Sequence, residues 1–77
     1  MEIQKFIENF ARALSETEAS ELSASTEFRD LDEWSSLTAV SIIAMVENEY
    51  NAELTNADIH RANTVGVIFE TVKGKIK

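Results

Sequence analysis

The sequence has no cysteine and no proline, and only two glycines among its 77 residues. Without cysteine the chain forms neither disulfides nor thiolate metal sites, so packed apolar side chains must hold it together. No apolar run is long enough to span a bilayer. The first residues, MEIQKFIENF, also lack the basic start and apolar stretch of a signal peptide. We therefore expect a cytoplasmic protein without a membrane span.

Basic residues are also scarce. Seven of them stand against fourteen acidic residues, and the formal net charge is −7. Between Leu14 and Asp58 there are eleven acidic residues and a single base, Arg29. Such a surface repels nucleic acid and attracts basic protein surfaces. We expect no nucleic-acid partner, although composition alone equally allows a charge that only keeps the protein in solution.

The residues that are present suit one small globular domain, residues 1–77, because 44% of them are hydrophobic and a chain this short has room for one core. Apolar residues at three- and four-residue steps predict helices. The first pattern consists of Ile3, Phe6, Ile7, Phe10, Ala13 and Leu14. The last, after a capping Thr64, consists of Val65, Ile68, Phe69 and Val72.

Two more helices are predicted between these. One runs from Ser36 to about Tyr50, and its expected core stripe consists of Leu37, Val40, Ile43, Val46 and Tyr50. The other is short, over Ala57–Arg61, with Thr55 and Asn56 as capping candidates. No stretch alternates with the period of a strand. The predicted class is therefore all-α, a bundle of three longer helices and a short third one.

Residues 15–35 form a long connection between the first two helices, rich in serine, threonine and acidic residues. Leu22, Phe28 and Leu31 are spaced through it, which predicts a loop pinned to the core with one short turn near residues 17–22.

Catalytic and metal-binding patterns are absent. The stretch DLDEWSSLTAVS begins like a calcium loop, but its fifth, sixth and twelfth positions hold Trp34, Ser35 and Ser41 in place of an oxygen ligand, glycine and glutamate. His60 is the only histidine and has no partner pattern, so we interpret it as a solvated helix residue. No nucleophile elbow surrounds Ser35 or Ser36. We predict no metal and no enzymatic activity.

The stretch EWSSLT places two serines at the head of the second predicted helix. Either Ser35 or Ser36 suits an N-cap. A phosphate ester on such a serine would also meet free amides and the positive end of the helix dipole. Trp34 has two open interpretations, a staple for the entering loop or part of a recognition surface.

With these features the whole chain resembles the acyl carrier proteins. The family motif is aspartate-serine-leucine at the start of the second helix, and SSL at residues 35–37 lies on it. The resemblance implies that Ser36 carries 4′-phosphopantetheine, taken from coenzyme A, and that Leu37 is the motif leucine that packs and aids recognition. Ser35 replaces the motif aspartate. Thr38 and Ser41 stand at positions that are often acidic in fatty acid synthesis carriers, and a tryptophan before the motif suggests a specialised pathway.

The resemblance implies a monomeric carrier of acyl or aminoacyl thioesters for fatty acid, polyketide or specialised lipid biosynthesis. Its partners would be a phosphopantetheinyl transferase and acyl-loading and acyl-processing enzymes with basic docking surfaces. The expected recognition residues are Trp34, Ser35, Leu37, Thr38, Val40, Ser41 and Glu47. The alternative is an unmodified acidic helical interaction module, in which Ser36 is only a cap.

Overall fold

The computed structural model describes residues 2–76. These residues form four α-helices and two short 3-10 helices, and none of them lies in a strand. The elements are α1 (Ile3–Ala13), η1 (Ala19–Glu21), η2 (Phe28–Asp30), α2 (Ser36–Tyr50), α3 (Asn56–Arg61) and α4 (Val65–Lys75). The all-α prediction, with three longer helices and a short third one, is confirmed.

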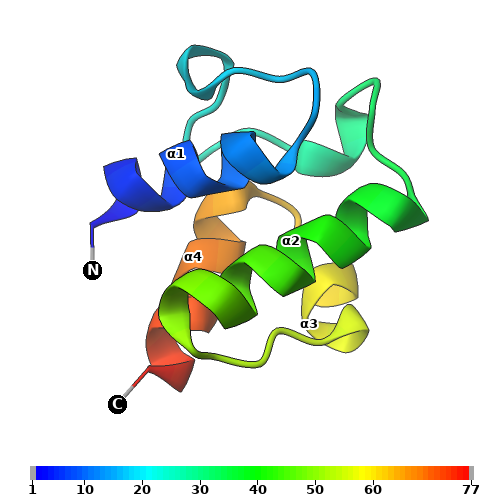
Figure 1. Cartoon of the computed structure of the whole chain (residues 1–77). Coiled ribbons are helices and arrows are strands. Elements are labelled where there is room, and N and C mark those ends of the chain that lie inside the picture. Colours follow the sequence, from blue (N-terminus) through cyan, green and yellow to red (C-terminus); the bar gives the residue numbers. More distant parts are fainter. Residues whose placement is uncertain (1, 77) are drawn as a thin grey trace.

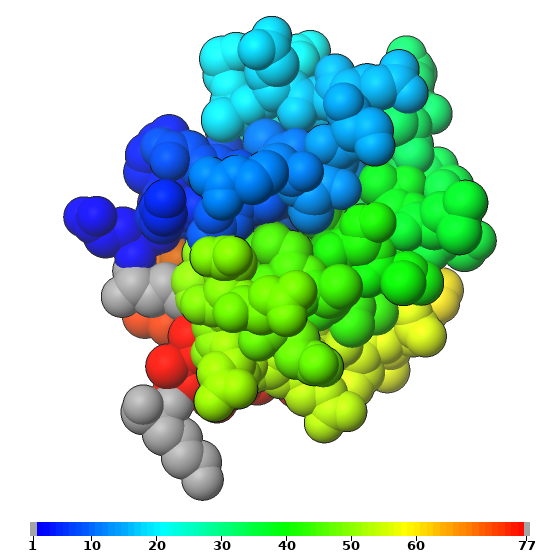
Figure 2. Space-filling view, viewed as in Figure 1, coloured from blue at the N-terminus to red at the C-terminus, as the bar shows by residue number. Residues whose placement is uncertain are grey.

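The helices form a bundle in which α1 and α2 lie side by side and α4 packs behind them against α1 (Figure 1). The short α3 contacts α4. Figure 2, in the same view, shows the seam between α1 and α2 turned toward the reader, with the long loop above it. Within residues 2–76, the longest apolar helical stretch falls short of what a membrane crossing requires.

All six aromatic side chains form one connected cluster through the core. Phe6 contacts Phe10, Tyr50 and Phe69, with ring centroids 6.0, 5.7 and 5.5 Å away. Phe10 contacts Phe28 of the loop at 6.3 Å. The cluster ends at Trp34, whose ring meets Phe28 edge-on at 4.7 Å. Because such pairs add to the burial of apolar surface, the cluster ties the loop to the three longer helices.

The predicted core stripe of α2 is wrong at its N-terminal end. Leu37 is 79% exposed and Val40 60% exposed, whereas the buried side chains are Thr38, Ile42 and Val46. Because each residue turns an α-helix by about 100°, residues spaced by repeated steps of three move progressively around the helix, whereas residues four apart stay closer to one side. The residues in the predicted stripe therefore lie on different sides of α2.

The helix ends follow from local chemistry. Thr55 caps α3 and Thr64 caps α4, as predicted, with their hydroxyls accepting from the amides of Asp58 and Val67. Asn51 ends α2 in the left-handed conformation, with φ of 53°. Asparagine is one of the few residues that tolerate this conformation without glycine's freedom.

The loop before α2 is pinned to the bundle, as its apolar residues predicted. Phe28 and Leu22 are buried and Leu31 packs against the core. The turn predicted near residues 17–22 is confirmed as η1, and η2 at Phe28–Asp30 is a second turn that the pattern did not predict. Arg29 extends from η2 and donates to the carbonyl of Ile59 at 2.9 Å. This bond joins the loop to α3.

The head of α4 is completed by this same loop. The amide of Val65 donates to the carbonyl of Thr26 at 3.0 Å, and the amide of Gly66 donates to that of Ala24 at 2.8 Å. A side chain at Gly66 would place its Cβ 2.8 Å from the Ala24 oxygen. Glycine is therefore required here for the close approach of two backbones.

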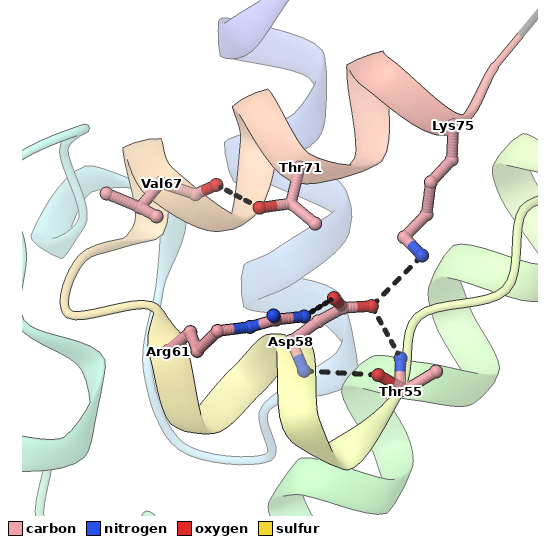
Figure 3. A network of polar contacts seen from close by, with 6 residues as sticks. All are labelled: Thr55, Asp58, Arg61, Val67, Thr71 and Lys75. Atoms are coloured by element: carbon pink, nitrogen blue, oxygen red, sulfur yellow. Dashed lines mark hydrogen bonds and ion pairs between the residues drawn. The ribbon is translucent and has the colours of Figure 1, made fainter.

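A buried carboxylate joins α3 to the end of α4 (Figure 3). Asp58 accepts from the Thr55 amide at 3.0 Å, from Lys75 at 3.0 Å and from Arg61 at 3.1 Å. The Thr55 amide and the two cations lower the pKa of Asp58 to about 2. The ionised carboxylate thus fixes α3 on the bundle, next to the start of α2.

Candidate functional site

The two neighbouring serines have different positions at the head of α2. Ser35 is the N-cap and Ser36 is the first residue of the helix. The Ser35 hydroxyl accepts from the Thr38 amide at 3.4 Å, while the Ser35 amide donates to the Thr38 hydroxyl at 2.9 Å. The Thr38 hydroxyl in turn donates to the carbonyl of Glu33 at 2.7 Å. Ser35 and Thr38 therefore cap the helix without the Ser36 side chain.

Ser36 is left free for chemistry. Its side chain is exposed, and no residue from 2 to 76 makes a hydrogen bond with its hydroxyl. Its amide and that of Leu37 belong to the first turn, where an α-helix provides no backbone acceptor. A phosphate ester on Ser36 would lie at the positive end of the α2 dipole, an arrangement worth about 0.3–1 kcal/mol at an exposed site. The residues here fit a phosphodiester on Ser36.

An apolar surface flanks this hydroxyl. Leu37 and Val40 are the two most exposed large hydrophobic side chains among the residues described. Val40 lies one turn beyond Ser36 and Glu47 three turns beyond, so both share its side of α2. Ser41 is exposed and donates to the carbonyl of Leu37 at 3.2 Å. Exposed apolar side chains beside a polar group are common where another protein binds.

Thr38 supports the helix start from within, because it is only 9% exposed and its hydroxyl is engaged in the cap. It also lines a depression on the α1 flank of α2, and its role in partner recognition stays a prediction. Trp34 packs on Phe28, as expected of a staple for the entering loop. Its half-buried side chain also lines a groove, and its role in recognition stays a prediction.

This groove lies beside Ser36 on the α3 flank of α2 and has a volume of about 410 Å³. Trp34, Val40 and Ile59 form part of its apolar lining, and Arg29 and His60 are among its polar residues. Ser36 itself lines one edge. An arm attached to Ser36 would therefore begin at an apolar surface that carries two nitrogen-rich side chains.

Sequence patterns did not identify Ile59 and His60 as neighbours of the serine. His60 is exposed, in agreement with its interpretation as a solvated residue, and it lines the same groove as Ser36. Periodicity locates a residue on its own helix and says nothing of where a short helix packs. For Arg29 the sequence did offer a sign of a special position, because it is the single base in a long acidic stretch.

Glu33 connects the loop to this site. Its carboxylate accepts from the Thr17 hydroxyl at 2.6 Å and from the amides of Ser15 and Glu16 at 2.8 and 2.9 Å. The Thr17 hydroxyl, followed by these amides, lowers the pKa of the Glu33 carboxyl. Because Glu33 also holds Thr38 through its carbonyl, the end of α1 and the start of α2 share one anchor.

The fold and site thus define a small helical bundle that presents a free serine at a helix N-terminus. The family model for the phosphopantetheine attachment site matches residues 4–72. The chain belongs to this family, and the resemblance to acyl carrier proteins is confirmed. No curated protein and no solved structure matches the chain.

Membership establishes the prosthetic group and the general role. The family carries 4′-phosphopantetheine covalently on a serine, so the chain is a phosphopantetheine carrier. Such a carrier interacts with a phosphopantetheinyl transferase and with the enzymes that process its cargo. Carrier domains of this kind typically hold groups for other enzymes and do no catalysis themselves.

Proposed function

We propose that Ser36 is the attachment serine and that the chain carries acyl or aminoacyl groups as thioesters on the 4′-phosphopantetheine arm. The observation that carries this assignment is that only one of the two serines at the helix start is engaged in hydrogen bonds. Ser35 is engaged as the cap, whereas Ser36 is exposed and its hydroxyl has no partner among residues 2–76. An ester on Ser36 therefore leaves the cap of α2 intact.

The residues of the chain would contribute binding and orientation. Ser36 supplies the ester oxygen, and the free amides of the first turn stabilise the phosphate. The arm supplies the thiol that the cargo needs, since the chain has no cysteine. Leu37 and Val40 offer apolar contacts to partner enzymes, and the acidic surface attracts their basic residues. We propose that the protein itself performs no catalysis.

We further propose that Trp34, Ser35, Ser41 and Glu47 complete the docking surface. Ser35, Ser41 and Glu47 are exposed. Trp34 and Ser35 line the same groove as Ser36, and Ser41 lies on the α1 flank of α2. The cargo would belong to fatty acid, polyketide or specialised lipid biosynthesis in the cytoplasm, with the carrier acting as a monomer. Tethering raises the effective concentration of the cargo at each partner, so contacts can be weak enough for rapid release.

The test is an intact-mass measurement after incubation with coenzyme A, magnesium and a broad-specificity phosphopantetheinyl transferase. We expect one phosphopantetheine addition in the natural protein and in Ser35→Ala, and none in Ser36→Ala. Circular dichroism checks that each variant is folded. Addition to Ser36→Ala would reject the assignment. Absence of addition to the natural protein, even with its cognate transferase, would favour the alternative of an unmodified acidic interaction module.

A further inference from the structure

The groove on the α3 flank of α2 differs in charge from the neighbouring depressions. Its lining includes Arg29 and His60 and no acidic residue. By contrast, Glu49 lines the groove between α1 and α2, and Glu16 and Glu33 line two depressions along the loop. A groove without acid is unexpected in a chain that has fourteen acidic residues and seven basic ones. This groove therefore attracts anions, whereas the acidic remainder of the surface attracts cations.

The guanidinium of Arg29 is held in position by neutral groups. It donates to the Ile59 carbonyl at 2.9 Å and to the Asn63 side-chain oxygen at 3.2 Å, and it lies 5.1 Å from the centre of the Phe28 ring. No carboxylate within residues 2–76 forms an ion pair with it. Two of its five N–H groups are used, so three remain for a ligand. A cation that is already fixed loses little side-chain freedom when it binds an anion.

The remaining lining suits a group that is part apolar and part charged. His60 is exposed and its ring makes no hydrogen bond in the described part of the chain, so it can donate to an anion in the groove. Trp34, Val40 and Ile59 provide apolar walls. No acidic residue precedes Glu47 in α2. A carboxylate on a short apolar stem therefore fits this lining, because the charge meets the guanidinium and the stem meets the apolar walls.

We propose that the groove on the α3 flank binds a glutamate or aspartate side chain of a partner protein. The carboxylate accepts from Arg29 and His60, and an apolar side chain next to it contacts Trp34 and Val40. Because Ser36 lines one edge of the groove, an enzyme that receives the arm has to approach this surface. The inference rests on the proposed function for that last step. The groove and the acidic surface then recognise opposite charges, which fixes the orientation of the partner.

Two dipeptide probes that differ only in charge test the groove. They are acetyl-Phe-Glu-amide and acetyl-Phe-Gln-amide, and each is titrated at low ionic strength into ¹⁵N-labelled protein without the arm. Amide shifts followed by NMR give the two dissociation constants. We expect the shifts to concentrate at His60 and at the Arg29 Nε–H, and the Glu probe to bind about three- to five-fold more tightly. Equal binding, or tighter binding of acetyl-Phe-Lys-amide at these residues, would overturn the proposal.

Substitutions separate recognition of charge from a purely structural role of Arg29. Arg29→Gln should abolish the preference for the Glu probe over the Gln probe, because it removes the guanidinium. If Arg29 only joined the loop to α3, its loss would weaken both probes equally, and an unchanged preference would overturn the proposal. His60→Glu keeps the test decisive if a thermal melt shows that Arg29→Gln is unfolded. It places a negative charge in the groove and should lower the preference at least about two-fold.

Arg61→Gln is the matched control. Arg61 follows His60 in α3, its side chain is 77% exposed, and it does not line the groove. The substitution removes the same charge as Arg29→Gln and should leave the preference for the Glu probe unchanged, because an exposed charge outside the groove is screened by solvent. A decrease as large as that in Arg29→Gln would mean general attraction to positive charge and would reject the inference.

The probe titration is independent of the attachment test, because the protein titrated carries no arm. Failure of the mass measurement would leave the probe result standing, and failure of the probes would leave attachment at Ser36 standing. The protein that carries the arm should also bind the Glu probe, since a partner meets it in that state. Loss of binding there would make the arm itself the occupant of the groove and would overturn the proposal.

Discussion

Asp58 is the residue whose loss should most clearly uncouple α3 from the bundle. Its ordinary pKa of 3.8 falls to about 2 in the folded protein. Each pH unit between the unfolded and folded values is worth about 1.4 kcal/mol, so the ionised carboxylate contributes about 2 kcal/mol to stability at neutral pH. We expect Asp58→Asn to lower the free energy of unfolding by about this amount, measured by urea denaturation at pH 7.

The pH dependence has a definite sign. Because the folded pKa lies below the unfolded value of 3.8, the folded protein binds fewer protons, and this stabilisation is complete only from about pH 5 upward. It is lost as the pH falls through about 2. The difference in unfolding free energy between the natural protein and Asp58→Asn should therefore be constant from pH 7 to about 5 and then shrink toward pH 2.

Matched variants separate this carboxylate from general charge effects. Asp32→Asn removes an exposed acid that makes no ion pair within residues 2–76, and it should change stability by less than about 0.5 kcal/mol. Arg61→Gln should also cost little, because the Arg61 side chain is 77% exposed. A loss in Asp58→Asn no greater than in Asp32→Asn, or a difference that does not depend on pH, would refute the reasoning.

Three further stability predictions are checked by urea denaturation of the variants. Gly66→Ala should lower the free energy of unfolding by about 1–3 kcal/mol through overpacking against the loop backbone. The control Gly74→Ala has open space around it and should leave that free energy unchanged or raise it by up to about 1 kcal/mol. Equal effects of the two substitutions would contradict this prediction. Asn51→Ala should cost about 1 kcal/mol because of its left-handed backbone, and Asn51→Gly should not. Ser35→Ala should cost about 1 kcal/mol as the loss of a cap, while Ser36→Ala stays close to the natural protein; the reverse order would reassign the cap.

Much of the fold was predictable because its signals are local. The apolar repeat of the first helix, the threonine caps and the spacing of Leu22 and Phe28 each depend on neighbouring residues. The core face of α2 was not predictable in the same way. Apolar side chains occur on several sides of α2, including the exposed Leu37 and Val40, so hydrophobicity alone does not identify the buried face.

The site was predictable only in part. Two serines before an apolar run predict the start of a helix, but two identical side chains do not show which of them is the cap and which has a free hydroxyl. The Thr38 hydroxyl makes Ser35 the cap, because it accepts from the Ser35 amide and donates to the carbonyl of Glu33. The groove on the α3 flank depends on tertiary packing that brings Ile59 and His60 beside Ser36, and no local pattern carries that information.

The backbone hydrogen bonds between the loop and α4 allow opening of the loop to be measured by amide hydrogen exchange. The amides of Val65 and Gly66 have their acceptors in the loop, at Thr26 and Ala24. They can exchange with solvent hydrogen when the loop lifts away, even if the rest of α4 stays folded. Their exchange rates would therefore follow the opening of the segment that leads into Trp34 and Ser36. Comparison of these rates with and without a bound partner would show whether docking at the start of α2 holds the loop closed.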